Sequence, residues 1–289
     1  MKAAAFDYVR AVDVEEVCRL LADAGDQERK IIAGGQTLVP LMAMRMARPG
    51  MLIDINDVEG LSFIEDKGDH ISIGGGTRQR ALERSGIISQ RLPLLAKAVR
   101  NVGHIQTRNR GTIGGSIVHG DPSAEIPMSA LALEGSIVLR SASGQTETPL
   151  EGFFEAAMVT AIEPDQILTE VRIPVWQSER TGTGFHETSS RQGDFAIVAA
   201  AAQIALSRDG SVCRAAITAG GVAPSPVKLR GVEKALIGRL PKDLGPALDA
   251  LDDEIDPDTD VHATAEYRSR VARRLVARAI MDAVSEASG

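Results

Sequence analysis

Two glycine-rich segments constrain the fold of this chain more than any other feature of its sequence. The first, at 33–37, reads Ala-Gly-Gly-Gln-Thr and joins a short apolar run to an apolar stretch typical of a helical turn. The second, at 111–116, reads Gly-Thr-Ile-Gly-Gly-Ser and also precedes an apolar segment. Because glycine has no Cβ, successive backbone N–H groups can converge on one point, and a helix beginning there adds the positive end of its dipole. Together the two segments predict a site that can hold a diphosphate without a lysine.

Other phosphate-binding motifs are absent from the sequence. Neither segment is followed by the Gly-Lys-Ser/Thr of a P-loop, and the chain contains no Gly-x-Gly-x-x-Gly of a Rossmann fold. Glycine pairs also mark tight turns and close packing, which is the interpretation we give to 74–76 and 220–221. Arg108 and Arg110, just before the second segment, could neutralise phosphate charge, although a solvated or partner-facing role is an equal alternative.

The composition is that of a globular protein that can bury a core without disulfides. The chain has 289 residues, of which 44% are hydrophobic and 25% are charged. Its two cysteines, Cys18 and Cys213, exclude a disulfide framework and an all-cysteine cluster, and we expect both to be small buried hydrophobes. The five histidines show no metal-ligand spacing, and we expect no metal site. His104 and His119 flank the second glycine segment, and their roles stay open.

The charge and the apolar runs exclude further classes. The formal net charge of -7 disfavours nucleic-acid binding. No apolar run reaches the roughly 18 residues that a membrane helix needs. The N-terminus carries no secretory pattern, so a cytoplasmic location is expected. The last helix carries an arginine-rich face that is either solvated or a docking surface for an acidic partner, formed by Arg268, Arg270, Arg273, Arg274 and Arg278.

Strands and helices are mixed along the chain without a regular strand–helix repeat, which predicts an α+β fold. Helices are predicted after the Asp13 cap, over 77–102 with breaks at Gly86 and Pro93, at 122–133, around Phe153-Phe154, and at 226–237, 244–251 and 262–284. Strands are predicted at 30–33, 51–55, 61–65, 70–74, 136–140 and 167–173, and at 196–206 and 212–219, which Asp209-Gly210 joins as a hairpin. The polar segment 174–184 is predicted to be a domain boundary.

Four motifs in a fixed order carry a family resemblance. The segments 33–40, 109–116, 121–127 and 191–196 resemble the flavin-binding medium subunit of molybdenum hydroxylases, a family that includes the carbon monoxide dehydrogenase medium subunit and the flavin domain of xanthine dehydrogenase. The resemblance covers nearly the whole chain. It implies a two-part FAD-binding module of the vanillyl-alcohol oxidase type at 1–176, with subdomains at about 1–56 and 57–176. A small α+β C-terminal domain at 177–289 would follow.

The resemblance also implies where FAD binds, with its pyrophosphate between the two glycine segments and its isoalloxazine toward the C-terminal domain. Glu125 matches an acidic cofactor contact, and Leu168 an apolar position beside the flavin. Phe185 stands where some relatives place a tyrosine, and His186 where xanthine dehydrogenases carry a lysine. The implied contacts are Ile32, Ala33, Gly34, Gly35, Gln36, Thr37, Leu38, Val39, Val102, Thr112, Ile113, Gly114, Gly115, Ser116, Glu125, Leu168, Phe185 and His186.

Departures from the family pattern sharpen these expectations. Ser116 replaces a frequent asparagine and can still donate a hydrogen bond. Gln36 stands where relatives with covalent flavin place a histidine, so the resemblance implies noncovalent FAD. Two cysteines cannot hold the extra iron–sulfur cluster of one branch of the family.

The function implied is that of an FAD-carrying electron-transfer subunit in a heterotrimeric molybdenum hydroxylase. A large subunit would hold molybdopterin, a small one two [2Fe-2S] clusters, and the usual assembly is a dimer of heterotrimers. This chain would take electrons from the clusters and pass them to an external acceptor, with no catalytic acid, base or nucleophile of its own. Two alternatives stay open: a stand-alone FAD-dependent oxidoreductase of the same superfamily, and a non-redox nucleotide-binding assembly module.

Overall fold

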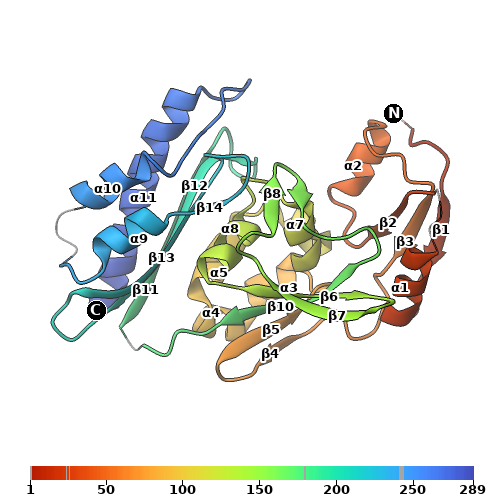
Figure 1. Ribbon diagram of the computed structural model, residues 1–289, viewed down its shortest axis with the longest axis horizontal. Coiled ribbons are helices and arrows are strands. Elements are labelled where there is room, and N and C mark those ends of the chain that lie inside the picture. Colours follow the sequence, from red (N-terminus) through yellow and green to blue (C-terminus); the bar gives the residue numbers. More distant parts are fainter. Residues whose placement is uncertain (1, 24, 26, 179, 241–243) are drawn as a thin grey trace.

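Three larger β-sheets follow one another along the molecule, as the computed structural model shows for residues 2–23, 25, 27–178, 180–240 and 244–289 (Figure 1). The N-terminal sheet contains β1 (Asp7–Arg10), β2 (Arg29–Ile32) and β3 (Met51–Asp54), all parallel, in the order β1-β3-β2. It is accompanied by α1 (Val14–Ala22) and α2 (Leu38–Ala43). The predicted cap of α1 is confirmed, because Asp13 accepts from the Glu16 amide at 2.7 Å and Glu16 from the Val12 amide at 2.8 Å.

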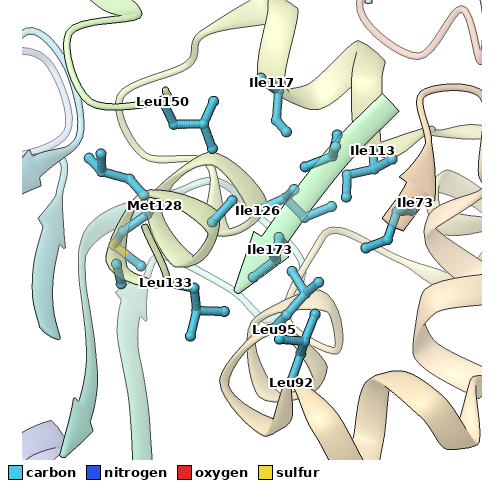
Figure 2. Packing of buried hydrophobic residues seen from close by; sticks show 14 of the residues in the cluster. Ile73, Leu92, Leu95, Ile113, Ile117, Ile126, Met128, Leu133, Leu150 and Ile173 are labelled. Atoms are coloured by element: carbon cyan, nitrogen blue, oxygen red, sulfur yellow. The ribbon is translucent and has the colours of Figure 1, made fainter. Parts of the chain in front are cut away.

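The central sheet is antiparallel and carries the largest core. Its strands are β4 (Ile64–Asp66), β5 (His70–Gly74), β6 (Ser136–Ser141), β7 (Gly144–Pro149) and β10 (Ile167–Pro174), in the order β4-β5-β10-β6-β7. The helices between β5 and β6 are α3 (Gln79–Arg84), α4 (Gly86–Arg91), α5 (Pro93–Val99), α6 (Ile105–Arg110), α7 (Ile113–His119) and α8 (Glu125–Ala132). Figure 2 shows side chains of α5, α7 and α8 meeting Ile73 of β5 and Ile173 of β10.

The C-terminal sheet lies against the central part of the molecule on one face and under helices on the other (Figure 1). It contains β11 (Thr181–Ser189), β12 (Ala196–Leu206), β13 (Val212–Gly220) and β14 (Val227–Lys228), paired antiparallel in that order. Its helices are α9 (Arg230–Leu236), α10 (Gly245–Leu251) and α11 (Ala265–Ser288). The predicted hairpin is confirmed, and Asp209 stabilises its turn by accepting from the Ser211 amide at 2.9 Å. Among the described residues no helix has the length and apolar character needed to cross a membrane.

Several expectations differ from the structure. The predicted helix at Phe153-Phe154 is wrong, because Phe154 begins β8 (Phe154–Ala156), which pairs with β9 (Val159–Thr160). Two adjacent aromatic residues carry no helical period, and both insert into the central core. Helix α9 starts only at Arg230, because β14 first pairs with β13. Cys18 is buried as expected, but Cys213, which we also expected to be buried, is exposed.

The arginine-rich face of α11 is only partly a solvated surface. Arg268 is buried and donates to the carbonyls of Ile197 and Gly221, so it ties α11 to the C-terminal sheet. Arg273 lies 2.6 Å from the carboxylate of Asp249 and 3.0 Å from that of Asp252. These two arginines therefore stabilise the fold, because their donors are bound within the chain.

Glycines allow α11 to approach β11 closely, and this packing yields a stability prediction. A Cβ at Gly184 would overlap the backbone carbonyl of Ala279, and one at Gly182 that of Ala283. The Gly184→Ala substitution should therefore lower the free energy of unfolding by about 1–3 kcal/mol, as overpacking of a core does. Urea unfolding followed by circular dichroism measures this.

The matched control is Gly86→Ala at the exposed start of α4, where a Cβ meets nothing within 4 Å, and its stability should be equal to that of the wild type or slightly higher. Equal unfolding midpoints for Gly184→Ala and the wild type would contradict the packing argument.

Candidate functional site

The first glycine segment offers a row of unused backbone donors. It leaves β2 at Ala33, and Gly35 adopts a left-handed φ of +70° that suits glycine. Within the described part of the chain, the N–H groups from Gly34 to Leu38 donate to no protein acceptor. Consecutive free amides around a left-handed residue form a concave site for an anion. The local chemistry of this segment therefore fits a phosphate group.

The second glycine segment has a different local structure. Most of its amides are bound within the chain: Gly114 donates to the Gly75 carbonyl at 2.9 Å, Ile113 to that of Thr77 at 3.0 Å, and Gly115 to the Thr112 hydroxyl at 3.1 Å. The Ser116 hydroxyl makes no hydrogen bond with the described residues. The second segment thus forms a fixed wall of the site and offers the Ser116 hydroxyl rather than a row of amides.

Backbone contacts hold the two segments together. A Cβ at Gly34 would overlap the carbonyl of Arg110, directly before the second segment. One at Gly114 would lie 2.6 Å from the carbonyl of Gly75, and Gly75 in turn meets the carbonyl of Leu168 on β10. The structure therefore brings together the first segment, the second segment and Leu168. The glycine triplet 74–76 therefore allows these backbone segments to pack closely, which is one of the roles expected for it from the sequence.

A pocket of about 600 Å³ lies beside the first segment. It is lined by Tyr8, Arg10, Ile32, Ala33, Gly34, Gly35, Gln36, Val39, Pro40, Asp54, Asn56 and Arg110. Arg110 is exposed there, and its guanidinium forms no ion pair with another described residue, so it can balance the charge of a bound anion. Arg108, the other arginine considered for neutralising phosphate charge, instead lies 2.9 Å from the carboxylate of Glu83.

A polar network that sequence analysis missed supports this pocket. The Tyr8 hydroxyl donates to Asp54, and the backbone amide of Asn56 donates to the same carboxylate at 2.8 Å. Burial acts to raise the pKa of Asp54, but the hydrogen bonds from Tyr8 and Asn56 outweigh it and hold that pKa below its usual value. Arg78 donates to the Asn56 side chain at 2.6 Å and to the Arg110 carbonyl, linking the N-terminal sheet to the second segment. The feature that could have pointed to this network is the position of Asp54 at the carboxyl end of a parallel strand, where ligands bind in such sheets.

The remaining predicted residues lie on α8, on β11 of the C-terminal sheet and just after α5. Glu125 is buried at the start of α8, and burial raises its pKa to about 8. Phe185 packs against the central core. His186, next along β11, points to the opposite face, where its Nε2 lies 2.7 Å from the carboxylate of Asp282 on α11. The structure therefore does not bring His186 together with Phe185. Val102 follows α5, and its carbonyl accepts from Arg108 at 2.9 Å.

Other titratable residues complete the surroundings. The His104 side chain contacts Gly193, which places the segment 191–196 against the start of α6. His119 closes α7. No group of three or more His, Cys, Asp or Glu side chains among the described residues could hold a metal ion. Sequence analysis also missed Glu187, whose Oε2 is buried without a hydrogen-bond partner.

Comparison with known proteins agrees with this architecture. Residues 4–176 match the family model described as the FAD binding domain in molybdopterin dehydrogenase, and residues 183–283 match the CO dehydrogenase flavoprotein C-terminal domain. The chain is 41% identical over 289 residues to the 6-hydroxypseudooxynicotine dehydrogenase complex subunit alpha of Paenarthrobacter nicotinovorans, covering 99% of this chain and 97% of that one.

Carbon monoxide dehydrogenase of Hydrogenophaga pseudoflava is similar both in sequence and in structure. Its medium chain is 33% identical over 277 residues, covering 95% of this chain and 96% of that one. A solved structure of that enzyme matches with a TM-score of 0.95 and 34% identity, over 99% of each chain. These matches confirm the α+β fold of a two-part FAD-binding module followed by a small C-terminal domain. The chain therefore belongs to the family of FAD-binding medium subunits of molybdenum hydroxylases.

Proposed function

We propose that this chain carries electrons within a heterotrimeric molybdenum hydroxylase, taking them from [2Fe-2S] clusters of a small subunit and passing them to an external acceptor. A large subunit would hold molybdopterin, and the assembly would be a cytoplasmic dimer of heterotrimers. The family membership supports an FAD-dependent oxidoreductase subunit. The observation that carries the proposal is the row of free amides from Gly34 to Leu38, because it matches the chemistry of a dinucleotide diphosphate.

In this proposal the two glycine segments have separate roles in holding FAD. The amides of 34–38 bind the diphosphate, Arg110 balances its charge, and Thr112 to Ser116 form the opposing wall. Phe185 and Glu125 face the flavin ring from the C-terminal sheet and from α8. Bound FAD supplies a redox centre, and the residues of this chain orient it and exclude water from it. We place the boundary between the FAD-binding module and the C-terminal domain between residues 176 and 177, and that between its two subdomains between 56 and 57.

We further propose that FAD is held without a covalent bond. The segment 32–39 contains no histidine, cysteine or tyrosine, and Gln36 occupies the position expected for an attachment residue. The names of two relatives support a multi-subunit enzyme, since one is a complex subunit and the other a medium chain. The site described above contains no paired acid and nucleophile, which favours an electron-transfer role over that of a stand-alone oxidoreductase.

The absorbance spectrum of the purified chain tests the cofactor and its attachment. After incubation with FAD and removal of the unbound excess, the chain should show flavin bands, and acid precipitation should release all of the flavin into the supernatant. Flavin that stays with the precipitate would contradict noncovalent binding. Co-expression with the two partner genes then tests the assembly, since a stable complex should contain molybdenum, iron and FAD together. Substrate turnover by the isolated chain would favour the stand-alone alternative.

Substitution of the segment glycines tests the placement of the diphosphate. Gly114→Val should abolish FAD binding, because its Cβ would meet the Gly75 carbonyl at 2.6 Å and push the second segment away. Gly35 is partly exposed and has a φ of +70°, so Gly35→Val should weaken FAD binding at least about tenfold while the chain stays folded. Isothermal titration calorimetry measures the affinity and circular dichroism the fold.

The matched control for these variants is Gly86→Val, at an exposed position with nothing within 4 Å of the added Cβ. It should bind FAD as the wild type does. Stoichiometric FAD with unchanged affinity in Gly35→Val would refute the assignment of this loop.

A further inference from the structure

The pairing of β11 with β12 determines which side chains face the central part of the molecule. Phe185 pairs with Ala201 and Glu187 with Ala199, and both alanines belong to the central core. The intervening His186 pairs with Ala200, which belongs to the core under α11. Side chains directly opposite one another in a sheet share a face. Glu187 therefore points the same way as Phe185, toward the central sheet and its helices.

Glu187 has no partner for its charge among the residues that the structure describes. Its Oε2 is buried and accepts no hydrogen bond, and burial raises its pKa to about 7. Lys97 of α5, which meets β11 by donating to the Thr183 carbonyl, is already paired, because it lies 2.6 Å from the Glu286 carboxylate. On β12 the residue opposite Glu187 is Ala199, and the Asp282 carboxylate of α11 is paired with His186 on the other face.

Glu125 approaches the same region from α8. It is 7% exposed, and its carboxyl accepts no hydrogen bond from another described residue. Burial raises its pKa most, and the negative charges of Glu187 and Asp121 raise it further. Arg108 of α6 opposes this rise, but its guanidinium is bound to Glu83 at 2.9 Å. Two carboxyl groups, one from α8 and one from β11, thus act on each other electrostatically, and no described cation is dedicated to either.

We propose that Glu187 and Glu125 form a carboxyl pair that keeps at least one proton at neutral pH and donates it, as a hydrogen bond, to the flavin ring bound beside Phe185. A protonated carboxyl is a donor, whereas two charged carboxylates in this region repel each other and a reduced, electron-rich ring. A buried polar atom without a partner is costly, and a ligand that completes its hydrogen bond explains why it is tolerated. The donor role rests on the proposed function, whereas the protonated pair is a property of the chain alone.

The first test uses the chain without FAD. Because the folded-state pKa of Glu187 is raised, the unfolded chain releases this proton at lower pH than the folded chain does, so the carboxyl reduces stability as the pH rises from about 4.3 to about 7. E187Q has no such proton. At each pH we divide the unfolding equilibrium constant of E187Q by that of the wild type. This ratio should be roughly tenfold to a hundredfold smaller at about pH 8.5 than at about pH 5. Infrared spectra at about pH 6 should show the C=O stretch of a protonated acid in the wild type, reduced in E187Q.

The matched control is E155Q, which removes an exposed carboxylate that makes no hydrogen bond with the described residues. Its stability relative to the wild type should not change with pH in this way. A ratio that is the same at both pH values for E187Q, with no change in the C=O band, would overturn the protonated pair.

The second test measures FAD affinity against pH. Wild-type affinity should fall at least about tenfold between about pH 6 and about pH 9, as the donor is lost. E187Q keeps a donor at every pH and leaves only Glu125 to titrate, so its affinity should fall clearly less than that of the wild type over this range. Parallel curves for the two proteins would overturn the donor role. If neither protein binds FAD at any pH, the proposed function fails and the donor role with it, while the stability and infrared measurements still decide the protonated pair.

Discussion

The close approach of backbone to backbone at a few glycines is the constraint on which the candidate site depends. Gly34 rests on the carbonyl of Arg110, and Gly114 on that of Gly75, at distances that no side chain would permit. The Ile113, Gly114 and Gly115 amides of the second segment donate within the chain, whereas those of 34–38 donate to no described residue. The two loops look alike in sequence, yet one is built as a wall and the other as a set of donors. The Asp54–Asn56–Arg78 network then fixes the N-terminal sheet against this wall.

A second constraint is the burial of β12 on both faces. Its alternate residues belong to two cores, so the C-terminal sheet joins the central part of the molecule without a solvated gap at this strand. The alternation decides which side chains of β11 can meet a ligand at the seam. Phe185 and Glu187 face inward, whereas His186 is bound to Asp282 under α11. A single step along β11 thus separates His186, which forms a structural ion pair, from Glu187, which we propose as a hydrogen-bond donor to the flavin.

Local signals were sufficient to predict the elements with their own caps and turns, such as α1 at Asp13 and the hairpin at Asp209. The glycine segments and their order predicted the family. Contacts between distant residues were not predictable. Arg268 looked like part of a solvated face, but its acceptors, Ile197 and Gly221, lie 71 and 47 residues away. The inward face of β11 could not be inferred either, because a strand covered on both sides carries no polar alternation.

The central claim is that the amides from Gly34 to Leu38 bind the diphosphate of FAD. The most direct measurement follows the backbone ¹H–¹⁵N resonances of the isotope-labelled chain as FAD is added, with ADP as a ligand that carries the diphosphate but no flavin. The account predicts that both ligands shift the resonances of 34–38, whereas FAD alone also shifts those of Phe185 and Glu187. Resonances of 34–38 that stay in place while FAD binds elsewhere would contradict it.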